Sequence, residues 1–137
     1  MKVFIDTGAF IAYFIKQDEF HDNAVARYNF YVQQKATLLT SDYILDELFT
    51  WFSAKQPKHF LEKLVTAIRK MQSAGEIRVL DIDKSIFAKA MEVLLKFQEH
   101  KISFTDATSY ILYKDFSLDE IFTLDSDFKK LRLKTSF

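Results

Sequence analysis

Residues 3–7, Val-Phe-Ile-Asp-Thr, are the stretch that decides the fold. A short, uninterrupted apolar run that ends at an aspartate is typical of a buried strand in a parallel sheet. The residues that follow, from Gly8 to Ile15, have the spacing of a short helix. A buried strand that runs directly into a helix predicts an α/β domain.

The rest of the chain continues this alternation of strands and helices. Short apolar runs predict further strands at residues 38–39, 77–80 and 121–124, and a short edge strand at 131–133. Helical spacing predicts helices at residues 22–34, 41–54, 57–74, 83–97 and 105–113, and a final helical turn that begins at Asp125. We therefore expect residues 1–137 to form one domain, with a parallel sheet flanked by helices.

The composition excludes several classes of protein. The 137 residues include 2 Gly and 1 Pro, too few for a collagen-like chain, a low-complexity chain or an all-β sandwich. The net charge of zero disfavours a non-specific nucleic-acid binder. The absence of Cys excludes thiolate chemistry and fits a reducing compartment. We expect a cytoplasmic protein without a signal peptide or membrane segment, because no apolar run approaches about 18 residues.

Four carboxylates fall where a parallel sheet would gather them. Asp6 and Asp125 follow the first and fourth predicted strands, Asp106 opens a helix, and Glu47 flanks the apolar stripe of another helix. Asp46, next to Glu47, points away from that stripe. Ligands bind beyond the carboxyl ends of the strands in such sheets. Four negative charges in one pocket call for a hard divalent cation such as Mg²⁺ or Mn²⁺, which suits the hydrolysis of phosphodiesters.

Most of these carboxylates also have a structural explanation. Ser103 and Asp106 have the spacing of a capping box, and Asp125 could cap a short helix. Glu47 could be a solvated charge on its helix. Asp6 is the hardest to explain this way, because an aspartate that closes a buried strand needs a partner.

Taken together, the four segments around these acids resemble a PIN domain. They are Val-Phe-Ile-Asp-Thr at 3–7, Leu-Asp-Glu-Leu at 45–48, Phe-Thr-Asp-Ala at 104–107 and Thr-Leu-Asp-Ser-Asp-Phe at 123–128. The size and build look most like VapC-type toxins. The resemblance implies a Rossmann-like, three-layer α/β/α fold with a mostly parallel sheet of four or five strands. It also implies an endoribonuclease that depends on Mg²⁺ or Mn²⁺.

The resemblance further implies roles for individual residues. Asp6, Glu47, Asp106 and Asp125 would form the catalytic quartet, and the three aspartates would be the metal ligands. The hydroxyl groups of Thr7 and Thr123 would steady the site, and Asp127 would be a secondary acid. Relatives of the VapC type commonly dimerise and pair with a small antitoxin, so we expect a homodimer and such a partner.

Other features leave alternatives open. The basic residues Lys129, Lys130 and Arg132, close to Asp125, could hold an RNA backbone or form a solvated run. Trp51 and Phe52 could belong to the core, to a dimer interface or to an antitoxin groove.

Three other functions are also open. The chain could be a catalytically silent PIN-like module that binds RNA or protein, or a stand-alone nuclease that processes RNA. A phosphatase with Asp6 as nucleophile is the third hypothesis, although Gly8 occupies the position where such enzymes usually have a second aspartate.

Overall fold

The computed structural model describes residues 1–137, and its centre is a sheet of four parallel strands. The strands are β1 (Lys2–Ile5), β2 (Thr37–Ser41), β3 (Arg78–Leu80) and β4 (Glu120–Phe122), in the order β3-β2-β1-β4. Phe4 of β1 lies opposite Leu39 of β2 and Ile121 of β4. Because β1 is internal and parallel to both neighbours, its continuous apolar run is buried on both faces. The predicted α/β class is confirmed.

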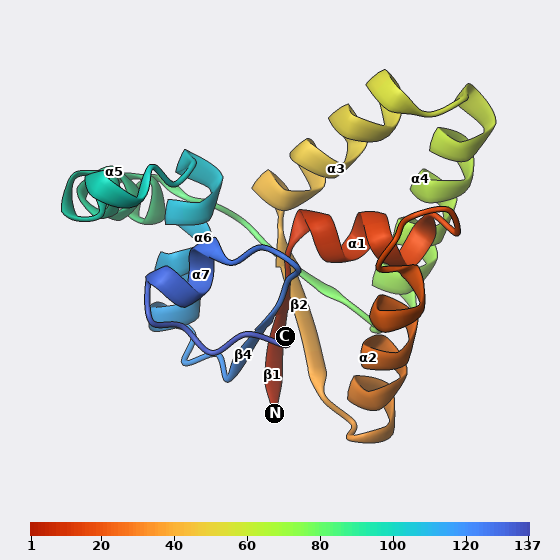
Figure 1. The fold of residues 1–137 in the computed structure, drawn as a ribbon, viewed down its shortest axis with the longest axis horizontal. Helices are drawn as coiled ribbons and strands as arrows, with labels where there is room; N and C mark the ends of the chain where they lie inside the picture. Colours follow the sequence, from red (N-terminus) through yellow and green to blue (C-terminus); the bar gives the residue numbers. More distant parts are fainter.

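Helices cover both faces of this sheet (Figure 1). Figure 1 shows α5 (Lys84–Lys96), α6 (Phe104–Asp115) and α7 (Asp127–Lys130) on one side of the strands. On the other side lie α1 (Thr7–Phe14), α2 (His21–Gln33) and α4 (Lys58–Ser73), while α3 (Asp42–Lys55) extends beyond the end of β2. A short 3₁₀ turn, η1 (Gln98–His100), joins α5 to the α6 segment. None of the helices is both long enough and apolar enough to cross a lipid bilayer.

Local chemistry explains where several helices begin and end. The side chains of Ser41 and Asp83 accept hydrogen bonds from the backbone N–H groups of Ile44 and Ile86, and these caps start α3 and α5. Helix α4 ends just before Gly75, which has a φ of 73°. This left-handed conformation favours glycine and stops the helix as predicted.

The predicted edge strand at residues 131–133 is wrong. The backbone N–H of Leu133 donates to the carbonyl of Phe128, and Arg132 has a φ of 63°, so this segment is a turn. The turn buries both Leu131 and Leu133, and this explains why their alternation resembled a strand. The chain reaches β4 only later, where Thr135 forms an isolated parallel bridge with Ile121.

A buried carboxylate lies at the amino end of β4. Glu120 is 2% exposed, and it accepts a hydrogen bond from the Arg27 guanidinium at 3.0 Å. The Tyr31 hydroxyl also donates to it, and the Lys134 ammonium is 3.8 Å away. The Arg27 guanidinium in turn lies over the rings of Tyr31 and Phe137, at 5.2 and 6.0 Å from their centroids. Two cations and a hydroxyl therefore surround this buried charge.

Candidate active site

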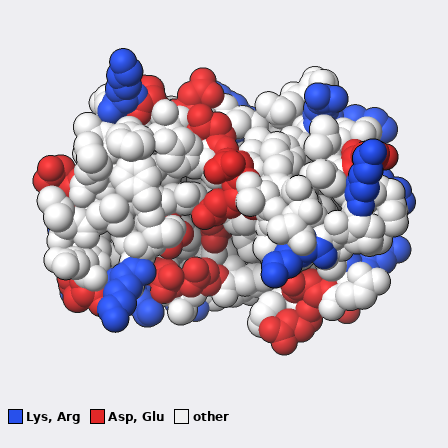
Figure 2. All heavy atoms as spheres, turned by 90° about the horizontal axis from the view of Figure 1, so that it is seen from above, with Lys and Arg blue, Asp and Glu red and all other residues white.

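Acidic side chains gather at the end of the sheet opposite Glu120. Asp6 follows β1 directly, Asp106 is in the first turn of α6, and Asp125 lies in the loop after β4. Figure 2 shows a band of acidic atoms that crosses this face between the two halves of the molecule, with Lys and Arg around its margins. The expected gathering of acids beyond the carboxyl ends of the strands is therefore present.

Asp6 is the most buried of these acids, with 7% of its surface exposed. Its Oδ2 accepts a hydrogen bond of 2.8 Å from the hydroxyl of Thr123. Burial raises the pKa of Asp6 to about 7, and the nearby carboxylates of Asp106 and Glu47 add to this rise. The chain supplies a hydroxyl to this carboxylate but no cation.

Glu47 is held on the inner side of α3. Its Oε1 accepts a hydrogen bond of 2.6 Å from the hydroxyl of Thr7, which is the first residue of α1. Its neighbour Asp46 is exposed, as the helical spacing predicted. The bond therefore fixes a carboxylate of α3 beside Asp6 rather than leaving it in solvent.

Asp106 has both a capping role and a place among the acids. Its backbone N–H donates to the Ser103 hydroxyl at 3.0 Å, and its Oδ2 accepts from the Ser103 N–H at 3.3 Å. The predicted capping box is confirmed. Burial raises the pKa of Asp106 to about 6, with further contributions from the charges of Asp125 and Asp127. The capping bonds oppose this rise because they favour the ionised form.

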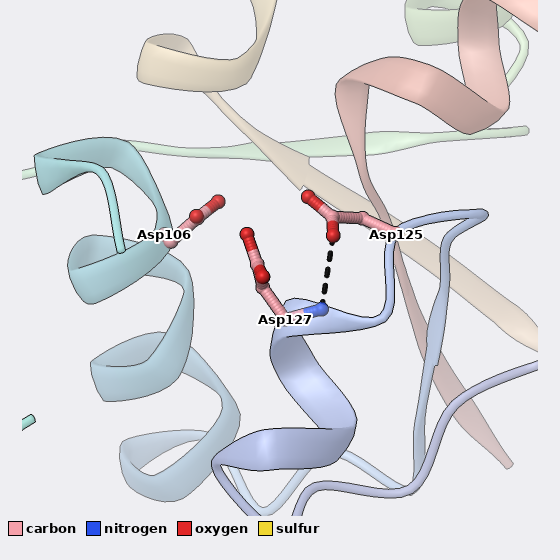
Figure 3. Close-up of side chains that lie close together, drawn as sticks. All are labelled: Asp106, Asp125 and Asp127. Carbon is pink, nitrogen blue, oxygen red and sulfur yellow. Dashed lines mark hydrogen bonds between the residues drawn. The ribbon is translucent and has the colours of Figure 1, made fainter. Parts of the chain in front are cut away.

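Asp125 and Asp127 face Asp106 across a narrow space (Figure 3). The three side chains each offer an oxygen, and these oxygens lie within 4.8 Å of one another. The loop is held by two bonds: the Asp125 N–H donates to the Thr123 hydroxyl at 3.0 Å, and the Asp127 N–H donates to Asp125 Oδ1 at 2.9 Å. Asp125 thus closes a turn ahead of α7 instead of capping that helix, whose first residue is Asp127.

The site differs from the expected quartet in two respects. Strand β4 ends at Phe122, so Asp125 lies beyond the end of the strand and not directly at it. The compact set of acids contains Asp127, for which the resemblance implied only a secondary role, whereas Asp6 and Glu47 are not part of that set. The Asp-x-Asp spacing at 125 and 127 was the signal in the sequence for including Asp127, because a tight turn can direct both carboxylates towards one point.

Of the basic residues next to the site, Lys129, Lys130 and Arg132, one already pairs with an acid of the site. The Lys130 ammonium lies 3.2 Å from Asp127 Oδ1, so it already pairs with the acidic cluster. Lys129 and Arg132 are exposed.

Comparison with known proteins identifies the family of this chain. A family model described as the PIN domain matches residues 3–134, which is nearly the whole chain. The chain belongs to the PIN-domain family. Its acidic cluster lies on segments that this match includes.

Relatives of this PIN domain include VapC proteins. It is 30% identical to a VapC ribonuclease of Archaeoglobus fulgidus over 132 residues, which cover 93% of this chain and 80% of that protein. The structure resembles VapC20 of Mycobacterium tuberculosis, a sarcin-ricin loop cleaving toxin, with a TM-score of 0.81 at 21% identity over 96% and 95% of the two chains. It also resembles VapBC2 of Rickettsia felis, solved with a DNA fragment from their promoter, with a TM-score of 0.75 at 14% identity over 99% and 98%. The two structural likenesses show a shared fold.

Proposed function

We propose that this PIN domain is an endoribonuclease that hydrolyses RNA phosphodiester bonds with Mg²⁺ or Mn²⁺. The observation that carries the proposal is the convergence of Asp106, Asp125 and Asp127 beside the buried Asp6. The similarity to a VapC ribonuclease supports the choice of RNA as substrate.

The donor set fits a hard divalent ion. The converging side chains offer only carboxylate oxygens, and neither His nor Cys is among them. Asp106 and Asp125 would hold the ion, together with Asp6, which follows β1, and Asp127 would support them. When bound, the ion would supply charge neutralisation at the phosphate and lower the pKa of a water molecule.

The chain's own residues would position the reactants. Glu47, fixed by the Thr7 hydroxyl, presents a carboxylate that can orient the attacking water. Thr123 holds Asp6 in place and supports the loop that carries Asp125. Lys129 and Arg132 are exposed close to that loop and would attract the RNA backbone, with Lys130 beside them.

The toxin of a VapBC-like toxin–antitoxin pair is the role that we propose for this enzyme in the cytoplasm. The sequence left open whether Phe52 belongs to the core, to a dimer interface or to an antitoxin groove. Phe52 is buried and lines an apolar cavity of about 390 Å³. Phe14, Phe60 and Leu64 line it as well, with Lys63 at the same cavity. An apolar segment of a small antitoxin would fit there. In cells, growth arrest by the wild type but not by Asp106→Asn would support this role.

A homodimer is also part of this proposal. Helix α5 exposes an apolar stripe of Phe87, Met91 and Leu95, which recur at every fourth residue. Exposed apolar patches of this kind mark sites of protein association. Sedimentation as a monomer at micromolar concentration would contradict the dimer.

The nuclease is tested by removing one carboxylate. Asp106→Asn should lower Mn²⁺-dependent RNA cleavage by at least about a hundredfold, because a charged ligand of the ion is lost. Asp6→Asn should act in the same direction. Asp46→Asn is the matched control, since this exposed aspartate lies outside the site, and it should retain wild-type cleavage.

Two results would contradict the nuclease. One is cleavage by purified Asp106→Asn at the wild-type rate. The other is a wild-type protein that binds no Mn²⁺ at about millimolar concentration in calorimetry, which would favour a catalytically silent binding module.

A further inference from the structure

A short segment near residue 136 lies against the outer edge of β4. The Ile121 N–H donates to the carbonyl of Lys134, and the Ser136 N–H donates to the carbonyl of Ile121, both at 2.9 Å. These bonds flank the isolated parallel bridge between Ile121 and Thr135. The segment therefore extends the sheet next to the strand that leads into the acidic loop.

The Ser136 hydroxyl joins this segment to Thr123 by two hydrogen bonds. It accepts one from the Thr123 N–H and donates one to the Thr123 carbonyl, each at 3.1 Å. Thr123 follows the last residue of β4 and is 1% exposed. A single side chain thus satisfies both backbone groups of a buried residue where the strand has ended.

Thr123 then passes this restraint to two acids. Its hydroxyl donates to Asp6 Oδ2 at 2.8 Å and accepts from the Asp125 N–H at 3.0 Å. The Thr123 side chain therefore connects the end of β1 to the loop that presents Asp125 and Asp127. A shift of the Thr123 backbone would move both of these bonds together.

We propose that Ser136 is a positioning residue of the acidic site. Its hydroxyl fixes the backbone of Thr123, and Thr123 sets the positions of Asp6 and Asp125. The inference rests on the proposed metal-dependent nuclease, because its effect is measured as metal affinity and turnover.

The rest of the segment has independent attachments, so that loss of the hydroxyl should leave the fold intact. The two backbone bonds to Ile121 do not involve the Ser136 side chain. The Phe137 ring lies 6.4 Å from the Phe122 ring, and Arg27 lies over it. These contacts should hold the segment in place in Ser136→Ala.

The test compares Ser136→Ala with Ser136→Thr, which keeps a hydroxyl at this half-buried position, and with Thr135→Val. Thr135→Val is the matched control, because the Thr135 hydroxyl donates only to the Phe137 carbonyl within the same segment. Calorimetry measures the Mn²⁺ affinity, and a cleavage assay with an RNA substrate gives kcat and KM. Urea denaturation measures the stability of the fold.

We expect Ser136→Ala to bind Mn²⁺ about tenfold more weakly and to lose kcat by a similar factor, with KM for RNA unchanged. Ser136→Thr and Thr135→Val should both stay within about twofold of wild type. If Ser136→Ala does not fold, Ser136→Cys replaces it, since a thiol keeps the volume but bonds weakly, and it should give a loss of about threefold.

Three results would contradict the positioning role of Ser136, and one of them would contradict the nuclease as well. Wild-type Mn²⁺ affinity and kcat in Ser136→Ala, or in Ser136→Cys where that variant replaces it, would overturn the positioning role and leave the nuclease standing. An equal loss in Thr135→Val would also overturn it, because the segment as a whole would then be responsible. A wild-type protein that neither binds Mn²⁺ nor cleaves RNA would overturn the nuclease and this inference together.

Discussion

Glu120 and Asp6 are buried carboxylates at opposite ends of the sheet, and their surroundings differ. Glu120 receives hydrogen bonds from Arg27 and Tyr31 and has the Lys134 ammonium nearby. Asp6 receives a hydroxyl hydrogen bond from Thr123, and its charged neighbours are the acids Asp106 and Glu47. One carboxylate is neutralised by the chain, whereas the other is buried among like charges.

The difference separates a carboxylate that the fold neutralises from one that we propose to be functional. A buried charge that has its counter-ions stabilises one arrangement of α2 against β4. A buried acid without a counter-ion raises the free energy of the folded protein, and such acids cluster at functional sites. The pKa of Asp6 is raised to about 7, first because its carboxylate is buried and then because the carboxylates of Asp106 and Glu47 lie nearby.

The largest loss of stability is expected from removing the ion pair between Arg27 and Glu120. Arg27→Met should lower the free energy of unfolding by about 3 kcal/mol, because it leaves the Glu120 charge buried with too few partners. Urea denaturation measures this change. Lys58→Met, which removes an exposed cation 4.0 Å from Glu62, is the control and should change stability by less than about 0.5 kcal/mol. Equal effects of the two variants would refute the contrast between the two carboxylates.

The acidic end should make the metal-free protein sensitive to pH. The pKa of Asp6 is about 7 in the folded protein, against an ordinary value of 3.8, so the folded state holds a proton that the unfolded chain releases between these values. Stability should therefore fall by about 2 kcal/mol as the pH rises from about 5 to about 8. Asp106 should add to this fall, since its pKa is raised to about 6.

The variant Asp6→Asn isolates the contribution of Asp6. Its stability should depend less on pH. At about pH 8 in the presence of a chelator it should be more stable than wild type by about 4 kcal/mol, because the whole difference between the folded and unfolded pKa values of Asp6 then counts. Urea denaturation at several pH values measures both effects. A wild-type protein with the same pH profile as this variant would show that Asp6 carries no such penalty.

The smallest effect is expected at the one lysine that pairs with the acidic cluster. The Lys130 side chain is half exposed, so Lys130→Met should change the free energy of unfolding by less than about 0.5 kcal/mol. It should tighten Mn²⁺ binding about twofold, because a positive charge 3.2 Å from Asp127 is removed. Calorimetry measures this change against Lys129→Met as control. Weaker Mn²⁺ binding in Lys130→Met would mean that the lysine supports the cluster instead of competing with the ion.

The strand–helix alternation and the placement of several acidic side chains could be predicted because they follow local rules. The apolar run of β1 placed Asp6 at the end of an internal strand. Helical periodicity distinguished Glu47, which contacts Thr7, from the exposed Asp46. The Ser103–Asp106 spacing predicted the capping box.

The remaining features depend on distant parts of the chain. The place of Asp127 in the compact set depends on how the turn after β4 faces α6. The contact between Ser136 and Thr123 forms only because the segment from Lys134 runs beside β4, and no local signal in the sequence marks it. The segment around Arg132 forms a turn with a left-handed residue instead of the expected strand. The sequence pattern did not show this, since the burial of Leu131 and Leu133 is compatible with both a turn and an extended chain.

The central position of β1 has a consequence for the order of folding. Its partners are β2 on one side and β4 on the other, and β4 begins more than a hundred residues after β1 ends. Chain segments that pair over such a separation come together late, since loop closure must precede their contacts. During synthesis, Asp6 therefore emerges early but meets Asp106, Asp125 and Asp127 only after nearly all of these 137 residues have been made. The nascent chain cannot assemble the complete acidic site before that point, so RNA close to the ribosome would not meet the proposed nuclease site in its complete form on a growing chain.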